Sequence, residues 1–169
     1  MNNMSRVILI LLGGPSSGKS KTIDAFFDNT AKSVTHQELK TEMGDVNVWK
    51  LCSSSPQESS GFGEYGDVES RIFKRIRKII DADYVAILPF TIPFNDKTGR
   101  AYTANLIIKP IKNLKKQGYH VLVVYLRKHD IYDSTVKKLW LAHTIESKKG
   151  KYQEQSVELK DFIKKAYQP

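Results

Sequence analysis

The sequence predicts an α/β fold, with a mainly parallel sheet that is flanked by helices on both faces. Two observations predict it: short, continuously apolar segments that end at turn residues, and amphipathic segments between them. Strands that alternate with helices favour parallel pairing, because each crossover helix returns the chain to the same edge of the sheet. With 40% hydrophobic residues and no repeat or linker, residues 1–169 are expected to form a single domain.

The first elements follow from local patterns. Residues 7–12 are all apolar and predict a buried strand, and residues 19 to about 31 predict an amphipathic helix. Residues 46–52 predict a second strand. Residues 38–43 are expected to pair with it as a hairpin, with a turn at Gly44 and Asp45.

The remaining elements are predicted in the same way. From Asp67 the pattern is helical, and residues 84–90 read as a buried strand. A helix over about 104–117 ends at Gly118, the residue type that takes a left-handed conformation most easily. Residues 120–126 are expected to be the last strand, followed by helices over about 134–147 and 156–167. The apolar stripe of the Asp67 helix consists of Ile72, Phe73, Ile76, Ile79 and Ile80.

Charge is distributed unevenly along the chain. The formal net charge is +9, composed of −3 over residues 1–70 and +12 over residues 71–169. A field of this sign attracts phosphate-rich partners, so a phosphorylated or nucleic-acid partner is expected through the basic C-terminal half. A solvated outer helix face is the preferred alternative for the cations at 71–78, because apolar residues already occupy the inner face.

Several classes of protein and site are disfavoured. The apolar run at 7–12 is too short to span a membrane and lacks a signal-peptide cleavage region, so we expect a cytoplasmic protein without a membrane partner. The single cysteine, Cys52, forms no internal disulfide. The four histidines lack the spacing of a metal site, and Trp49 and Trp140 are interpreted as core residues.

One sequence motif predicts a binding site. The pattern G-x-x-x-x-G-K-[ST] lies between the first strand and the first helix, which is the context it requires. Its glycines let backbone N–H groups turn toward a phosphate, and the helix N-terminus adds partial positive charge. The residues expected to bind the ligand are Gly13, Gly14, Pro15, Ser16, Ser17, Gly18, Lys19, Ser20 and Lys21.

With this motif the sequence resembles the P-loop NTPase superfamily. The resemblance implies a three-layer sandwich that binds Mg²⁺ with ATP or GTP, with Lys19 on the β- and γ-phosphates and the Ser20 hydroxyl on the metal. The acidic residue that the superfamily usually supplies from a neighbouring strand is absent after residues 84–90 and 46–52. Either hydroxyl groups and water complete the metal shell, or a loop acid does so: Glu58, Glu64, Asp67 or Asp96.

The sequence resembles two subfamilies of this superfamily. The chain is similar to small nucleoside, polynucleotide or zeta-toxin-like kinases, which surround the transferring phosphoryl group with cations. Arg127 follows the strand at 120–126 and suits that catalytic role, together with Lys19. The alternative for Arg127 is a surface ion pair with Asp130 or Asp133.

The second resemblance is to Ras-like GTPases. A hairpin, then Gln57 and Glu58, then Arg127 to Asp130 follow the order of D-x-x-G-Q-E and N-K-x-D, although Ser53, Pro56 and Arg127 depart from those motifs. A nucleotide-dependent switch or assembly protein with slow turnover is a further alternative.

Overall fold

The fold is α/β, as the sequence predicts. The computed structural model describes residues 5–28, 36–52, 55–56, 65–92, 94–95, 100–101 and 105–168. The strands are β1 (Arg6–Gly13), β2 (His36–Thr41), β3 (Gly44–Lys50), β4 (Tyr84–Thr91), β5 (Phe94–Asn95), β6 (Arg100–Ala101), β7 (His120–Arg127) and β8 (Leu141–Glu146). The helices are α1 (Lys19–Phe26), α2 (Tyr65–Ile76), α3 (Asn105–Lys116), α4 (Asp133–Val136) and α5 (Tyr152–Ala166), with a 3₁₀ turn, η2, over Asp130–Tyr132.

The main sheet has six strands in the order β2-β3-β4-β1-β7-β8, and β5 and β6 form a separate ribbon. All neighbours pair in parallel except β2, which is antiparallel to β3. Gly13 on the central strand β1 pairs with Thr91 at the end of β4, and Leu12 pairs with Tyr125 on β7. The carboxyl ends of these three strands therefore meet at one edge of the sheet.

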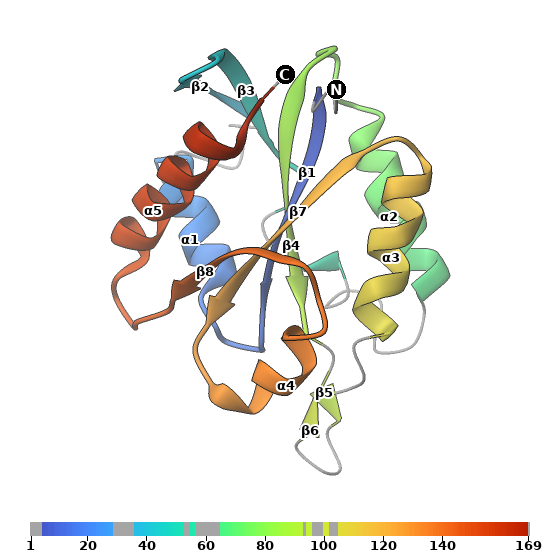
Figure 1. Ribbon diagram of the computed structural model, residues 1–169, viewed down its shortest axis with the longest axis vertical. Coiled ribbons are helices and arrows are strands. Elements are labelled where there is room, and N and C mark those ends of the chain that lie inside the picture. Colours follow the sequence, from blue (N-terminus) through green and yellow to red (C-terminus); the bar gives the residue numbers. More distant parts are fainter. Residues whose placement is uncertain are drawn as a thin grey trace.

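Helices cover both faces of the sheet, with α1 and α5 on one side and α2 and α3 on the other (Figure 1). The side chains of β1 alternate between these layers. Val7, Leu9 and Leu11 pack in the core with α1 and α5, and their neighbours in β1 pack in the core with α2 and α3. Burial on both faces explains why residues 7–12 form an unbroken apolar run.

The hairpin and the first helix differ in detail from the prediction. The hairpin is present, but its turn is at Glu42 and Met43, and Gly44 already begins β3 with a φ of +112°. Helix α1 ends at Phe26, five residues before the predicted end at about residue 31. Residues 29–35 lie outside the described part of the chain.

The predicted helix over 134–147 is wrong. Helix α4 covers only its first turn, and β8 follows and pairs in parallel with β7, so residues 120–126 do not form the last strand. In β8 the exposure alternates, and Ile145 is buried in the core with α5. This period of two is the strand signal, but the short segment shows it weakly. Helix α5 begins at Tyr152, before the predicted residue 156.

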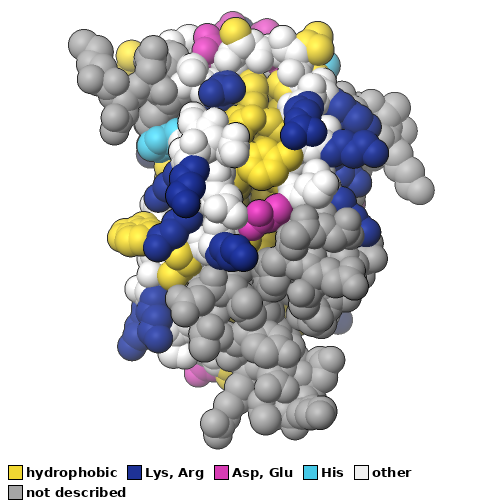
Figure 2. All heavy atoms as spheres, turned by 90° about the vertical axis from the view of Figure 1, so that its right-hand side faces the viewer, with side chains coloured by type: hydrophobic (Ala, Val, Ile, Leu, Met, Phe, Trp, Pro, Cys, Tyr) yellow, Lys and Arg dark blue, Asp and Glu magenta, His cyan; other side chains and the backbone are white. Residues whose placement is uncertain are grey.

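The predicted apolar stripe that begins in α2 is correct except at Ile80, since Phe73 and Ile79 also pack against the core. Ile72 and Ile76 are buried, whereas Ile80, beyond the end of α2 at Ile76, is 88% exposed. Lys74 is exposed, as expected for the outer face of a sheet-covering helix, and Lys78 in the turn after it is also exposed. On this side of the molecule, Lys and Arg side chains lie around an apolar strip (Figure 2).

Candidate functional site

The loop between β1 and α1 lies at the carboxyl end of the central strand. The backbone N–H of Ile92, just after β4, donates to Gly13 O at 2.9 Å and joins the two strand ends. Ser16 and Gly18 have left-handed backbone conformations, with φ of +58° and +88°, which turn the chain back into α1. No side chain caps α1, so its first N–H groups and its positive dipole end face the loop.

Two glycines of this loop are required by close neighbours. A Cβ on Gly14 would overlap the ring of Tyr132, which is buried in η2. A Cβ on Gly18 would lie 2.7 Å from Cε1 of Tyr152, in addition to the strain of a positive φ. Packing therefore requires a glycine at position 14, and both packing and backbone conformation require one at Gly18, the second glycine of the motif.

Lys19 points back over the loop. Its ammonium donates to Gly14 O at 2.8 Å, to Gly13 O at 3.2 Å and to Ser17 Oγ at 3.3 Å, and the residue is only 5% exposed. These three acceptors are neutral oxygens. Because an anionic oxygen adds a direct attraction between opposite charges, an ammonium in this position is suited to exchange these acceptors for those of an anion.

Residues far away in the sequence hold the outer side of the loop. Lys128, after β7, donates from Nζ to Ser16 O at 2.8 Å. Ser147, after β8, donates from Oγ to Ser17 O at 2.7 Å, and its backbone N–H donates to Arg127 O at 2.7 Å. The ends of β7 and β8 therefore fix two carbonyl groups of the loop.

A buried glutamine extends this support. Gln155 on α5 is 3% exposed, donates from Nε2 to Thr22 Oγ1 on α1 at 2.9 Å, and accepts the N–H of Lys148 at 2.9 Å. It thereby ties α1 to the segment after β8. Sequence analysis missed Ser147 and Gln155, because no local pattern reports a contact between residues 130 or 133 positions apart.

The other predicted loop residues differ in exposure. Pro15 and Ser16 are exposed, and Ser20 is half-buried in the first turn of α1. Lys21 is exposed, and its Nζ lies 5.1 Å from the ring centroid of Tyr152. Lys21 therefore lies against an aromatic ring, whereas Lys19 lies within the loop.

Hydroxyl groups lie where the neighbouring strand ends. Thr91, the last residue of β4 and the partner of Gly13, donates from Oγ1 to Ser55 Oγ at 2.6 Å, and both residues are buried. Among the described residues, no group of three or more His, Cys, Asp or Glu side chains could hold a metal ion. Of the loop acids suggested from the sequence, Glu58, Glu64 and Asp96 lie outside the described residues.

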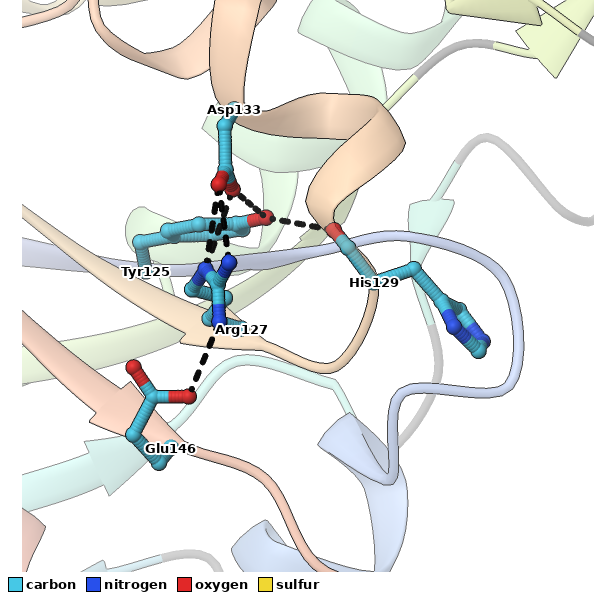
Figure 3. Close-up of polar contacts among 5 residues, drawn as sticks. All are labelled: Tyr125, Arg127, His129, Asp133 and Glu146. Carbon is cyan, nitrogen blue, oxygen red and sulfur yellow. Dashed lines mark hydrogen bonds and ion pairs between the residues drawn. The ribbon is translucent and has the colours of Figure 1, made fainter.

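Arg127 lies in a cluster of charged groups (Figure 3). Its Nε and Nη2 donate to the Asp133 carboxylate at 3.0–3.2 Å, and its Nη1 donates to Glu146 Oε2 at 3.3 Å. The ion pair with Asp133 that the sequence offers as an alternative is therefore present, and Glu146 is an additional partner. Hydrogen bonding to Asp133 raises the pKa of Arg127.

Tyr125 completes this cluster. Its hydroxyl lies 3.3 Å from both His129 O and Asp133 Oδ1, while the His129 ring points away (Figure 3). Burial, followed by the negative charge of Asp133, raises the pKa of Tyr125. The hydroxyl therefore stays protonated at neutral pH and helps to orient the carboxylate that binds Arg127.

Comparison with solved structures shows a similar fold. The chain is similar to the crystal structure of APE1195, with a TM-score of 0.54 and 15% sequence identity over 97% of this chain and 98% of that chain. No family model and no curated protein matches the sequence. At this level of identity the similarity supports the α/β fold alone.

The described helices can also be compared with the dimensions of a bilayer. In the part of the chain that the structure describes, no helix combines the length and the apolar composition needed to cross a membrane.

Proposed function

We propose that the chain is a P-loop NTPase with the corresponding three-layer sandwich, and that residues 13–20 bind the phosphates of Mg-ATP or Mg-GTP. It then transfers or hydrolyses the γ-phosphoryl group, most simply as a small kinase-like phosphotransferase. The observation that carries the proposal is the position of Lys19, whose ammonium is bonded to three oxygens of its own loop at the start of α1. The sequence has a single cysteine, Cys52, which is buried, and this fits the proposed cytoplasmic location.

The chemistry follows from the groups of the loop. Phosphate oxygens would replace the neutral acceptors of Lys19, while backbone N–H groups at the start of α1 would bind the same anion. The left-handed backbone at Ser16 and Gly18 holds the loop in the turn that this binding needs. Phosphoryl transfer requires mainly positioning and charge stabilisation, and a preformed loop supplies both.

The described residues fit Mg²⁺ through hydroxyl groups. Ser20 would hold the ion, and the buried pair of Thr91 and Ser55 lies at the end of the strand that pairs with Gly13. When bound, Mg²⁺ neutralises charge on the phosphate oxygens. With hydroxyl groups in this position, the phosphates themselves and water would supply most of the coordination, because Mg²⁺ usually keeps several waters.

A thermal-shift experiment tests this proposal. The protein is heated with ATP, GTP, ADP or GDP, each with and without Mg²⁺, and with inorganic phosphate as a comparison. A ligand at about 100 times its Kd adds roughly 2.7 kcal/mol to the free energy of unfolding, which raises Tm by several degrees. No shift with any nucleotide at millimolar concentration would contradict the proposal.

A Ras-like GTPase or nucleotide-dependent switch is the second candidate. It is favoured by the contact between Lys128 and Ser16, because in the Ras-like interpretation residues 127–130 read the base and must lie beside the phosphate loop. Asp130 is exposed at this point and could accept hydrogen bonds from guanine. A preference for GTP, with partner binding that changes with the bound nucleotide and no acceptor turnover, would support the switch over the kinase.

A further inference from the structure

Positive charge lies along the outer surface of α3 and at the C-terminal end of α2. Five exposed lysines define this surface, which we call the cationic helix surface: Lys74, Lys78, Lys109, Lys112 and Lys116. Neither residues 70–80 nor residues 105–119 contain an acidic residue. Figure 2 shows Lys and Arg side chains on either side of an apolar strip on this side of the molecule.

The two helices are held in a fixed relative position. Nδ2 of Asn113 on α3 lies 2.9 Å from each carboxylate oxygen of Glu69 on α2. Beside this contact, the rings of Phe73 and Tyr119 pack at a centroid distance of 6.5 Å. The positive side chains therefore extend from a rigid base, which lowers the entropy lost when an extended ligand binds.

These lysines are available for a ligand. Within the described ranges, none of the five residues of the cationic helix surface forms an ion pair with a carboxylate. Next to them, Lys115 on α3 lies over the ring of Trp140, with Nζ 5.1 Å from the centroid. Trp140 is 68% exposed, so the interpretation of this tryptophan as a core residue is wrong. Its ring offers an accessible flat surface at the end of α3.

We propose that the cationic helix surface binds a strand of nucleic acid, with Trp140 stacking on a base. The combination of a positive surface and an exposed aromatic ring is what single-strand binding sites use. Lys109, Lys112 and Lys116 follow one another at about 4.5–6 Å along α3, which lies between the rise of one nucleotide and that of two in a stacked strand, about 3.4 and 6.8 Å. A linear row of this kind matches a polymer of phosphates better than it matches separate lipid headgroups.

This surface is distinct from the proposed nucleotide site. It lies on the outer side of the α2 and α3 layer, whereas the loop at 13–20 lies at the carboxyl edge of the sheet (Figure 1). Strand binding therefore does not rest on nucleotide binding, and Lys19→Ala should leave it unchanged.

Fluorescence anisotropy with labelled 20-nucleotide oligo(dT) and oligo(rU) tests the proposal across a salt series. For single strands, log K falls with log salt by about 0.7 for each phosphate contact. Lys109→Gln/Lys112→Gln and Lys74→Gln/Lys78→Gln should each weaken binding and make the slope shallower by about 1.4. The matched control, Lys164→Gln/Lys165→Gln on α5, removes the same charge from the opposite layer and should change neither affinity nor slope.

Trp140→Ala supplies a second, independent readout. It should weaken binding by roughly 5- to 150-fold, the range for one stacked base, with an unchanged salt slope, and Trp140→Phe should recover part of the loss. Unchanged Tm values would show that the variants are folded. The proposal is overturned if the wild type shows no salt-dependent strand binding, if the α5 control loses as much affinity as the α3 variant, or if phosphatidylserine vesicles bind in place of oligonucleotides.

Discussion

The ammonium of Lys128 lies 2.8 Å from the carbonyl oxygen of Ser16, a residue 112 positions earlier in the chain. The contact is exposed, and it joins the end of β7 to the middle of the β1–α1 loop. Ser147 adds a second contact to the next carbonyl, that of Ser17. The loop therefore depends on the ends of β7 and β8 for part of its shape.

Lys128→Met should weaken nucleotide binding without changing the fold. Loss of one exposed hydrogen bond that orders the loop corresponds to about 0.5–1.5 kcal/mol, or roughly 2- to 13-fold in Kd. Isothermal titration calorimetry with Mg-ATP and Mg-GTP measures the change. Lys138→Met removes another exposed lysine charge and is the control; an equal loss in both variants would indicate a general charge effect and contradict the positioning role.

Lys19→Ala should remove most nucleotide affinity, by tenfold or more, because this ammonium is the cation inside the loop. Thermal shift and calorimetry measure binding, and circular dichroism verifies the fold. Lys21→Ala is an informative comparison, since the Lys21 ammonium lies against Tyr152 and should matter much less. Normal binding by a folded Lys19→Ala protein would show that the loop is not the phosphate site.

Ser20→Ala should weaken the Mg²⁺ dependence of nucleotide binding, whereas Ser20→Thr should keep it, because both serine and threonine present a hydroxyl to the metal. Titration of Mg²⁺ at fixed nucleotide concentration gives the half-saturating metal concentration for each variant. We expect an increase of several-fold for the alanine variant only. An unchanged Mg²⁺ requirement would place the metal on other residues.

Arg127→Ala decides between two roles. The catalytic role, still a prediction, requires the guanidinium to leave Asp133 and Glu146. If Arg127 has this role, the alanine substitution should lower kcat by about 10³–10⁵ with little change in Kd. The ion pairs of Arg127 with Asp133 and Glu146 in Figure 3 support the ion-pair role, in which the kcat of Arg127→Ala stays near that of the wild type. Steady-state rates beside nucleotide Kd values, with Arg127→Lys as the conservative variant, separate these outcomes.

His120 should make stability depend on pH. Burial, with Lys115 as a smaller cause, lowers the pKa of His120 below its usual value of 6.5. As the pH falls below about 6.5, the unfolded chain binds a proton at His120 before the folded chain does. The free energy of unfolding therefore decreases with falling pH until the pH passes the folded-state pKa of His120. Urea unfolding at pH 7.5 and at pH 5 should show a smaller fall for His120→Gln than for the wild type; an equal fall would contradict this assignment.

Prediction from the sequence succeeded where the pattern was local and strong. The apolar run at 7–12, the β2–β3 hairpin and the α3 stop at Gly118 are all present, and Gly118 has a φ of +89°. It failed at residues 134–147, where a short strand with alternating exposure was interpreted as a helix. Pairing with β7 decides that segment, and no property of the segment alone reports this pairing.

By itself, the sequence determined the α/β class and the strand, glycine loop and helix at residues 6–26, because each depends on neighbouring residues and their backbone preferences. Only the tertiary structure decided that Lys128, Ser147 and Gln155 support that loop, that Arg127 binds two carboxylates, and that Trp140 lies exposed beside Lys115. These contacts join distant parts of the chain through the order of strands in the sheet. The strand order depends on the packing of the whole core, so it cannot be predicted from local sequence patterns.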